Sequence, residues 1–179
     1  MLKLKFEKYH GLGNDFVIFD EKELKDNNIE DYSKLASSVC DRHFGIGGDG
    51  IIILRYVDNK PFMLYYNSDG SQAPMCGNGI RCFAYYLKNN NLVTEDTFVV
   101  KTVPGDLTIE TQQTKDQFLV RVNMGKPIFD TQDYINSNKE RFIEEFVDID
   151  GETRILSYLF TGTDHVVTFV QNLDDVDIV

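Results

Sequence analysis

A cysteine stands at the head of a predicted helix, in the segment of residues 75–82. From Gly77 onward apolar residues recur at helical spacing, so we expect a helix that begins there and ends in the polar run 88–91. Unpaired N–H groups and the positive end of the macrodipole favour a thiolate at such a position. Gly77 and Gly79 leave these N–H groups uncovered, so the turn can also bind a carboxylate. We therefore predict that Cys76 is an activated thiol that suits an amino acid with its α-carbon over the sulfur; the alternative is a structural cysteine in a turn.

The other two cysteines, Cys40 and Cys82, are interpreted as core residues. Cys82 lies among apolar residues inside the predicted helix, and Cys40 lies on the apolar face of an earlier one. A zinc site built from Cys40, His43, Cys76 and Cys82 would need paired ligand spacings, and the only close pair is Cys40 and His43. We predict no metal site, and free thiols throughout.

Residues 45–50 formally match the pattern G-x-G-x-x-G of dinucleotide-binding loops. That function needs a strand before the loop and a helix after it. Here a predicted helix precedes the glycines and an apolar strand follows them. The sequence therefore predicts a tight loop, which could lie against the active site, and no dinucleotide.

Alternating and continuous apolar runs predict a strand-rich chain of the α+β class. One further helix is expected from Asp31 to Gly45, with Tyr32, Leu35, Ala36, Val39 and Cys40 on one face. A hinge is predicted at residues 124–127, so the expected division is a first domain at residues 1–122 and the start of a second at 123–179. Strands are predicted at residues 2–9, 16–19, 51–54, 62–66, 98–103, 107–111, 118–122, 154–160 and 166–170.

The bulk properties exclude several classes of function. A formal charge of −11 does not suit a nucleic-acid or acidic-membrane partner, which needs clustered Lys and Arg. The sequence has no apolar run that would serve as a signal peptide or membrane span. We expect a cytoplasmic protein whose partner is a small molecule.

A similarity between two segments of the chain suggests an internal duplication. Residues 13–19 resemble residues 162–168, with Gly, Asp, Val and an aromatic ring in register. The offset is 149 residues, from 162 minus 13, so a second copy of the Cys76 segment would fall beyond Val179.

Four segments together resemble the diaminopimelate epimerase family, in both order and spacing. The resemblance is dense from residue 1 to about residue 125. The segments are Tyr9-His10-Gly11-Leu12-Gly13-Asn14-Asp15-Phe16, Cys40-Asp41-Arg42-His43-Phe44-Gly45-Ile46-Gly47-Gly48-Asp49-Gly50, Asn67-Ser68-Asp69-Gly70-Ser71 and Met75-Cys76-Gly77-Asn78-Gly79-Ile80-Arg81-Cys82-Phe83.

The resemblance implies a curved, mixed or antiparallel sheet around a central helix, followed by a pseudo-symmetric second domain. It implies interconversion of LL- and meso-diaminopimelate by two thiols, for lysine and peptidoglycan synthesis, with no cofactor and with a homodimer as a possible assembly. Cys76 would be the first-domain thiol. The alternatives are a racemase of another amino acid, or a remnant that binds amino acids without turnover.

The resemblance also implies roles for individual residues. Gly77 and Asn78 would bind the reacting carboxylate, and Asn14 and Asn67 would hydrogen-bond the substrate, although either asparagine could be a turn former. His165 matches a histidine that the family places near the thiols, and the alternative is a core residue. His10 and His43 are interpreted as structural.

Two positions depart from the family pattern. Residues 162–165 read Gly-Thr-Asp-His where many members have Gly-Asn-Pro-His, and Gly50 stands where many have Gln. No second Cys-Gly segment occurs in the 179 residues. The expectation is a truncated chain that lacks the second thiol and does not epimerise by itself.

Overall fold

The computed structural model describes residues 3–130 and 139–176. The chain divides into two compact units, Met1–Asn123 and Met124–Val179, and each unit is described by itself.

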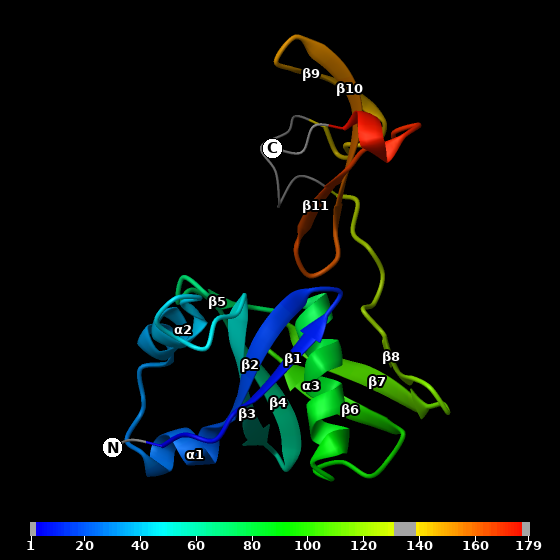
Figure 1. Cartoon of the computed structure of the whole chain (residues 1–179). Helices are drawn as coiled ribbons and strands as arrows, with labels where there is room; N and C mark the ends of the chain where they lie inside the picture. Colours follow the sequence, from blue (N-terminus) through cyan, green and yellow to red (C-terminus); the bar gives the residue numbers. More distant parts are fainter. Residues whose placement is uncertain (1–2, 131–138, 177–179) are drawn as a thin grey trace. The chain divides into compact units, whose positions relative to one another are not determined.

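The described residues of the first unit form one mixed sheet of eight strands (Figure 1). The strands are β1 (Glu7–Gly11), β2 (Asn14–Asp20), β3 (Gly50–Val57), β4 (Lys60–Asn67), β5 (Gln72–Ala73), β6 (Thr97–Thr102), β7 (Gly105–Gln113) and β8 (Phe118–Val122). Their order is β1-β2-β3-β4-β6-β7-β8, with β5 paired to β4. The pairs β2/β3 and β4/β6 are parallel and the other pairs are antiparallel.

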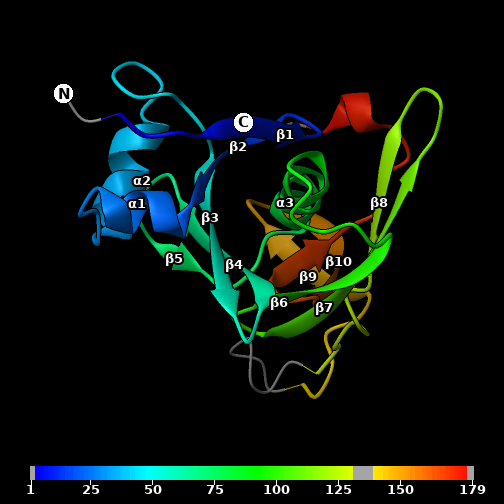
Figure 2. The ribbon, with the colours of Figure 1, turned by 90° about the horizontal axis from the view of Figure 1, so that it is seen from below.

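Helix α3 (Gly77–Asn89) lies inside the curl of this sheet (Figure 2). It packs against β1, β2 and β8. Ile80, Phe83, Ala84 and Leu87 are completely buried, so the apolar spacing in the sequence marks the face that meets the sheet. The expected α+β fold, with a curved sheet around a central helix, is confirmed.

Two further helices, α1 (Glu21–Asp26) and α2 (Tyr32–Cys40), cover the other face of the sheet (Figure 2). Successive strand residues point to opposite faces, so Ile52 and Leu54 join the core around α3, while Ile51 and Ile53 join the core under α1 and α2. Because both faces are covered, β3 is a continuous apolar run instead of an alternating one.

The first unit differs from the sequence prediction in several details, among them the unpredicted strand β5. The first strand begins at Glu7, which pairs with Ile18 of β2, and residues 3–6 precede this pairing. Helix α2 ends at Cys40, five residues before the expected Gly45, since the Asp41 carboxylate accepts hydrogen bonds from two later backbone N–H groups and so forms a turn. Helix α1 was not predicted.

The second unit contains a three-stranded antiparallel sheet in the order β11-β10-β9. Its elements are β9 (Glu145–Ile149), β10 (Glu152–Phe160), β11 (Asp164–Val167) and the 3-10 helix η1 (Leu173–Asp175). The strand predicted at residues 166–170 begins two residues earlier and ends three residues earlier, and β9 was not predicted. In the part of the chain that the structure describes, no helix has the length and apolar character needed to cross a membrane.

Candidate active site

Cys76 is the N-cap residue of α3, so the helix begins where the sequence predicts. Its backbone is extended, and its Sγ accepts a hydrogen bond from the Gly79 N–H over 3.3 Å. The N–H groups of Gly77 and Asn78 have no acceptor among the described residues. An added Cβ at Gly77 would meet nothing within 4 Å, so this helix end is open to an anionic group.

Asn14 comes to the thiol from the turn between β1 and β2. The two turn residues, Leu12 and Gly13, have φ values of 57° and 87°, as a two-residue hairpin turn with matching twist requires. This turn places the Asn14 Oδ1 atom 3.8 Å from the Cys76 Sγ and 3.3 Å from the Asn78 Nδ2. The structure thus brings three of the predicted site residues together.

Asp49, in the glycine-rich loop of residues 45–50, binds the NH₂ group of the Asn14 amide. Its carboxylate accepts hydrogen bonds from the Asn14 Nδ2 over 2.7 Å and from the Asp15 N–H over 3.0 Å. This loop follows α2 and leads into β3, an order opposite to that of a dinucleotide-binding loop. The interpretation as a tight loop is confirmed, and the loop touches the site through Asp49.

Arg42 joins this loop to the hairpin. Its guanidinium donates to the carboxylates of Asp15 and Asp49, in each case over 2.8 Å, and Lys8 adds a second ion pair to Asp15 over 3.0 Å. The hydrogen bonds from Arg42, with those from Lys8, hold the pKa of the Asp15 carboxyl well below its usual range.

Asn67 is placed at the end of β4, opposite Gly50 in β3. The Tyr65 hydroxyl donates to its Oδ1 over 2.7 Å, and its Nδ2 donates to the Ser71 Oγ over 3.0 Å. The next residue, Ser68, donates its N–H to the Asp49 carbonyl oxygen over 3.0 Å. Asn67 is therefore joined to the same loop that holds Asn14.

The departure at Gly50 has a structural reason. A Cβ at this position would lie 2.6 Å from the Tyr65 Cε2 and 2.5 Å from the Tyr66 carbonyl oxygen. The Tyr65 ring, which is 7% exposed, occupies the space that a longer residue 50 would need. Tyr65 and Gly50 therefore form a matched pair beside Asn67.

Cys40 and Cys82 are core residues, as predicted. They are buried in two different apolar clusters, on opposite faces of the sheet, whereas Cys76 is partly exposed. Burial raises the pKa of each of the two core thiols to about 11.

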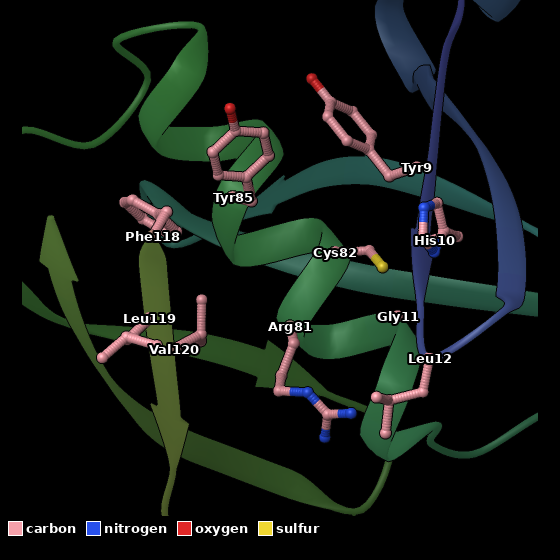
Figure 3. Close-up of a pocket in the computed structure, with 10 residues that line it drawn as sticks. All are labelled: Tyr9, His10, Gly11, Leu12, Arg81, Cys82, Tyr85, Phe118, Leu119 and Val120. Carbon is pink, nitrogen blue, oxygen red and sulfur yellow. The ribbon is translucent and has the colours of Figure 1, made fainter. Parts of the chain in front are cut away.

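Arg81 connects the site to a neighbouring pocket of about 500 Å³ between β1 and β8. Its guanidinium donates to the Gly77 carbonyl oxygen over 3.0 Å and to the Asn78 Oδ1. Figure 3 shows the Cys82 sulfur pointing from α3 toward His10 and Gly11 of β1, and Arg81 extending from α3 between β1 and β8.

His165 lies in the second unit, at the start of β11, so its predicted role beside the thiols stays a prediction. Its side chain is exposed and its Nε2 shares a hydrogen bond of 3.1 Å with the Thr163 hydroxyl.

Sequence reasoning missed Asp49, Arg42, Tyr65 and Arg81, which hold the predicted residues in place. All except Tyr65 lie inside the segments that carry the family resemblance, and that is the signal that could have found them. Their partners could not be inferred, since Asp49 and Asn14 are 35 residues apart and meet only through tertiary packing.

Comparisons with known proteins agree on a family. The sequence profile of the diaminopimelate epimerase family matches residues 6–129. A diaminopimelate epimerase of Caldanaerobacter subterraneus subsp. tengcongensis is 41% identical over 96% of this chain and 62% of its own length, and one of Alkaliphilus metalliredigens is 41% identical over 97% and 62%. The chain therefore spans 62% of the length of these curated relatives.

Among solved structures, a phenazine biosynthesis protein of the PhzF family from Bacillus anthracis matches 94% of this chain and 55% of its own, with a TM-score of 0.61 and 18% identity. At this identity the likeness shows a shared fold. With the family profile and both relatives, the sequence evidence goes further: the chain belongs to the diaminopimelate epimerase family.

Proposed function

We propose that Cys76 is an acid/base thiol in the epimerisation of LL-diaminopimelate to meso-diaminopimelate, a step of lysine synthesis. The proposal rests on one observation: the Cys76 sulfur lies between a donor, the Gly79 N–H, and an acceptor, the Asn14 Oδ1. A donor supports the thiolate, which can remove a proton, and an acceptor supports the thiol, which can return one. Family membership supports the choice of substrate.

In the proposed reaction the substrate carboxylate binds the N–H groups of Gly77 and Asn78 at the start of α3. The Cys76 thiolate takes the α-proton, and the electron pair of the broken C–H bond is delocalised into the carboxylate. Fixed donors aimed at that carboxylate stabilise the developing negative charge. A second acid on the opposite face then gives a proton to the α-carbon and completes the inversion.

Asn14 and Asn67 are proposed to orient the substrate, and His165 to act beside the thiols. No cofactor takes part in the proposed chemistry. We expect the reaction to occur in the cytoplasm, where thiols remain reduced, and a homodimer is the assembly to test.

Exchange of α-hydrogen in heavy water tests the proposal. The chain is incubated with LL- and meso-diaminopimelate, proline and lysine, and deuterium at the α-carbon is followed by NMR. We expect exchange with diaminopimelate. Because a single thiol returns a deuteron to the face that it deprotonated, exchange without inversion is expected from Cys76 alone.

The other outcomes identify the alternatives. Exchange with proline or lysine and none with diaminopimelate would indicate a racemase of another amino acid. Binding of diaminopimelate without any exchange would indicate an amino-acid-binding protein without turnover. Net inversion would show that a second proton donor acts in this chain.

A further inference from the structure

Two amide side chains in the site lie between two charged residues, and these charges fix the direction of both amides. At one end the Asp49 carboxylate can only accept hydrogen bonds, so the Asn14 amide must present its NH₂ group there. At the other end Arg81 can only donate, so Asn78 must present its carbonyl oxygen to it. The Asn78 NH₂ group then faces the Asn14 oxygen, at 3.3 Å. Asp49 at one end and Arg81 at the other therefore favour the same orientation of the two amides.

The orientation of the Asn14 amide determines which of its atoms contacts the Cys76 sulfur. With its NH₂ group on Asp49, Asn14 turns its oxygen toward the Cys76 sulfur, at 3.8 Å. A carbonyl oxygen at this place accepts the S–H proton and repels the thiolate. It therefore opposes the Gly79 N–H, which donates to the same sulfur over 3.3 Å.

Asp49 is itself held in one orientation. Its Oδ1 accepts from the Arg42 guanidinium over 2.8 Å, so its Oδ2 is the atom left for Asn14. The Asp15 N–H, at 3.0 Å, donates to the same Oδ2. Both donors to Oδ2 therefore require an acceptor at this atom.

Two titratable groups of the described residues that interact with Cys76 keep their protons at neutral pH. Tyr65 of β4 and Cys82 of α3 both interact with it electrostatically. Burial raises the pKa of Tyr65 above its ordinary value, and it raises the pKa of Cys82 to about 11. The charged residues in contact with the two amides are Asp49 and Arg81.

We propose that Asp49 is a positioning residue for Cys76: by fixing the Asn14 amide with its oxygen on the sulfur, it keeps the thiol form accessible beside the helix N-terminus. The inference deepens the proposed function, because it concerns the proton state of the same thiol. A general acid that has lost its proton cannot return one, so this control serves the reprotonation step.

The variant Asp49→Asn tests the proposal with the smallest change in shape. Arg42 keeps the oxygen of the new side-chain amide on its own side, so an NH₂ group takes the place of Oδ2 and faces the Asn14 NH₂ group. Two donors cannot pair, so Asn14 loses its anchor on Asp49, and the Asn78 NH₂ group alone no longer fixes its oxygen on the sulfur. Loss of this acceptor favours the thiolate, and iodoacetamide should alkylate Cys76 about threefold faster at neutral pH, with a matching rise in ultraviolet thiolate absorbance.

The matched control is Asp15→Asn. It removes the same charge from the same Arg42 partner, but the Asn14 amide donates to the Asp49 carboxylate and not to that of Asp15. We expect the Cys76 alkylation rate to stay within about twofold of the wild type. Peptide mass spectrometry separates Cys76 from the two buried cysteines. If Asp49→Asn fails to fold, Asn14→Ala replaces it: loss of the acceptor alone should accelerate alkylation about threefold.

Two results would overturn the proposal. One is an unchanged or slower alkylation of Cys76 in Asp49→Asn, or in Asn14→Ala where that variant replaces it. The other is an equal acceleration in the test variant and Asp15→Asn, which would mean that the loop has only loosened. Since no amino acid is present, these results are independent of whether the chain exchanges substrate protons.

Discussion

Gly50 is the position at which one added methyl group should disturb both the sheet and the site. A Cβ there would lie 2.5 Å from the Tyr66 carbonyl oxygen and 2.6 Å from the Tyr65 Cε2, while ordinary contacts begin at 3.4 Å. Strand β3 is paired on both sides, to β2 and β4, and cannot shift away. Tyr65 is also fixed, because its ring packs on the Phe16 ring, with 5.9 Å between the ring centroids, and its hydroxyl donates a hydrogen bond to Asn67.

The expected cost follows from three contributions. Overpacking a dense core costs about 1–3 kcal/mol. Displacing Tyr65 from Asn67 loses a hydrogen bond that contributes about 1 kcal/mol. Alanine also makes the unfolded chain less flexible than glycine does, which stabilises the folded state by about 0.4–1 kcal/mol. The variant Gly50→Ala should therefore lower the free energy of unfolding by about 2 kcal/mol.

Urea unfolding followed by tyrosine fluorescence measures this difference. The control is Gly48→Ala in the same loop, where the added Cβ would lie 3.4 Å from the nearest atom, the Asp15 carbonyl oxygen. Its free energy of unfolding should stay within about 0.5 kcal/mol of the wild type. Equal stability of the two variants would refute the steric argument.

Two further predictions concern ionisation. In the folded state Arg42 holds the pKa of Asp15 low, so the stability from this carboxylate is complete above its unfolded value of about 3.9 and is lost as the pH falls toward the folded value. In the variant Asp15→Asn, the free energy of unfolding should decline less steeply between about pH 5 and pH 2, and a slope equal to the wild type would contradict the pairing. Iodoacetamide should label Cys76 well before Cys40 and Cys82, because burial raises the pKa of both core thiols to about 11. Peptide mass spectrometry follows the labelling, and equal rates at Cys82 and Cys76 would be inconsistent with the packing.

The parts of the fold that depend on local pattern were predictable. Helix α3 and its cysteine cap follow from apolar spacing and from glycines at the start of the helix. The similarity between residues 13–19 and 162–168 is matched by a similar turn conformation at the start of each segment. Gly13 and Gly162 have φ values of 87° and 92°, and each lies in the turn before a hairpin strand, β2 or β11.

The parts that depend on distant partners were not predictable. Helix α1 has six residues and one buried apolar residue, Leu24, which is too little for a periodic signal. Strand β9 has five residues and is mostly exposed. The Asp49 carboxylate reaches Asn14 only after the loop has folded over the hairpin, and no local pattern carries that pairing.

The central claim is that Cys76, at the N-terminus of α3, moves the α-proton of the substrate. Its most direct test is the variant Cys76→Ala. The control is Cys82→Ala, a variant that lacks the buried thiol of α3 and keeps Cys76. The measurement is the rate at which deuterium enters the α-carbon of diaminopimelate in heavy water. The account predicts that Cys76→Ala abolishes the exchange and that Cys82→Ala retains it. Exchange at the wild-type rate in Cys76→Ala would contradict the account.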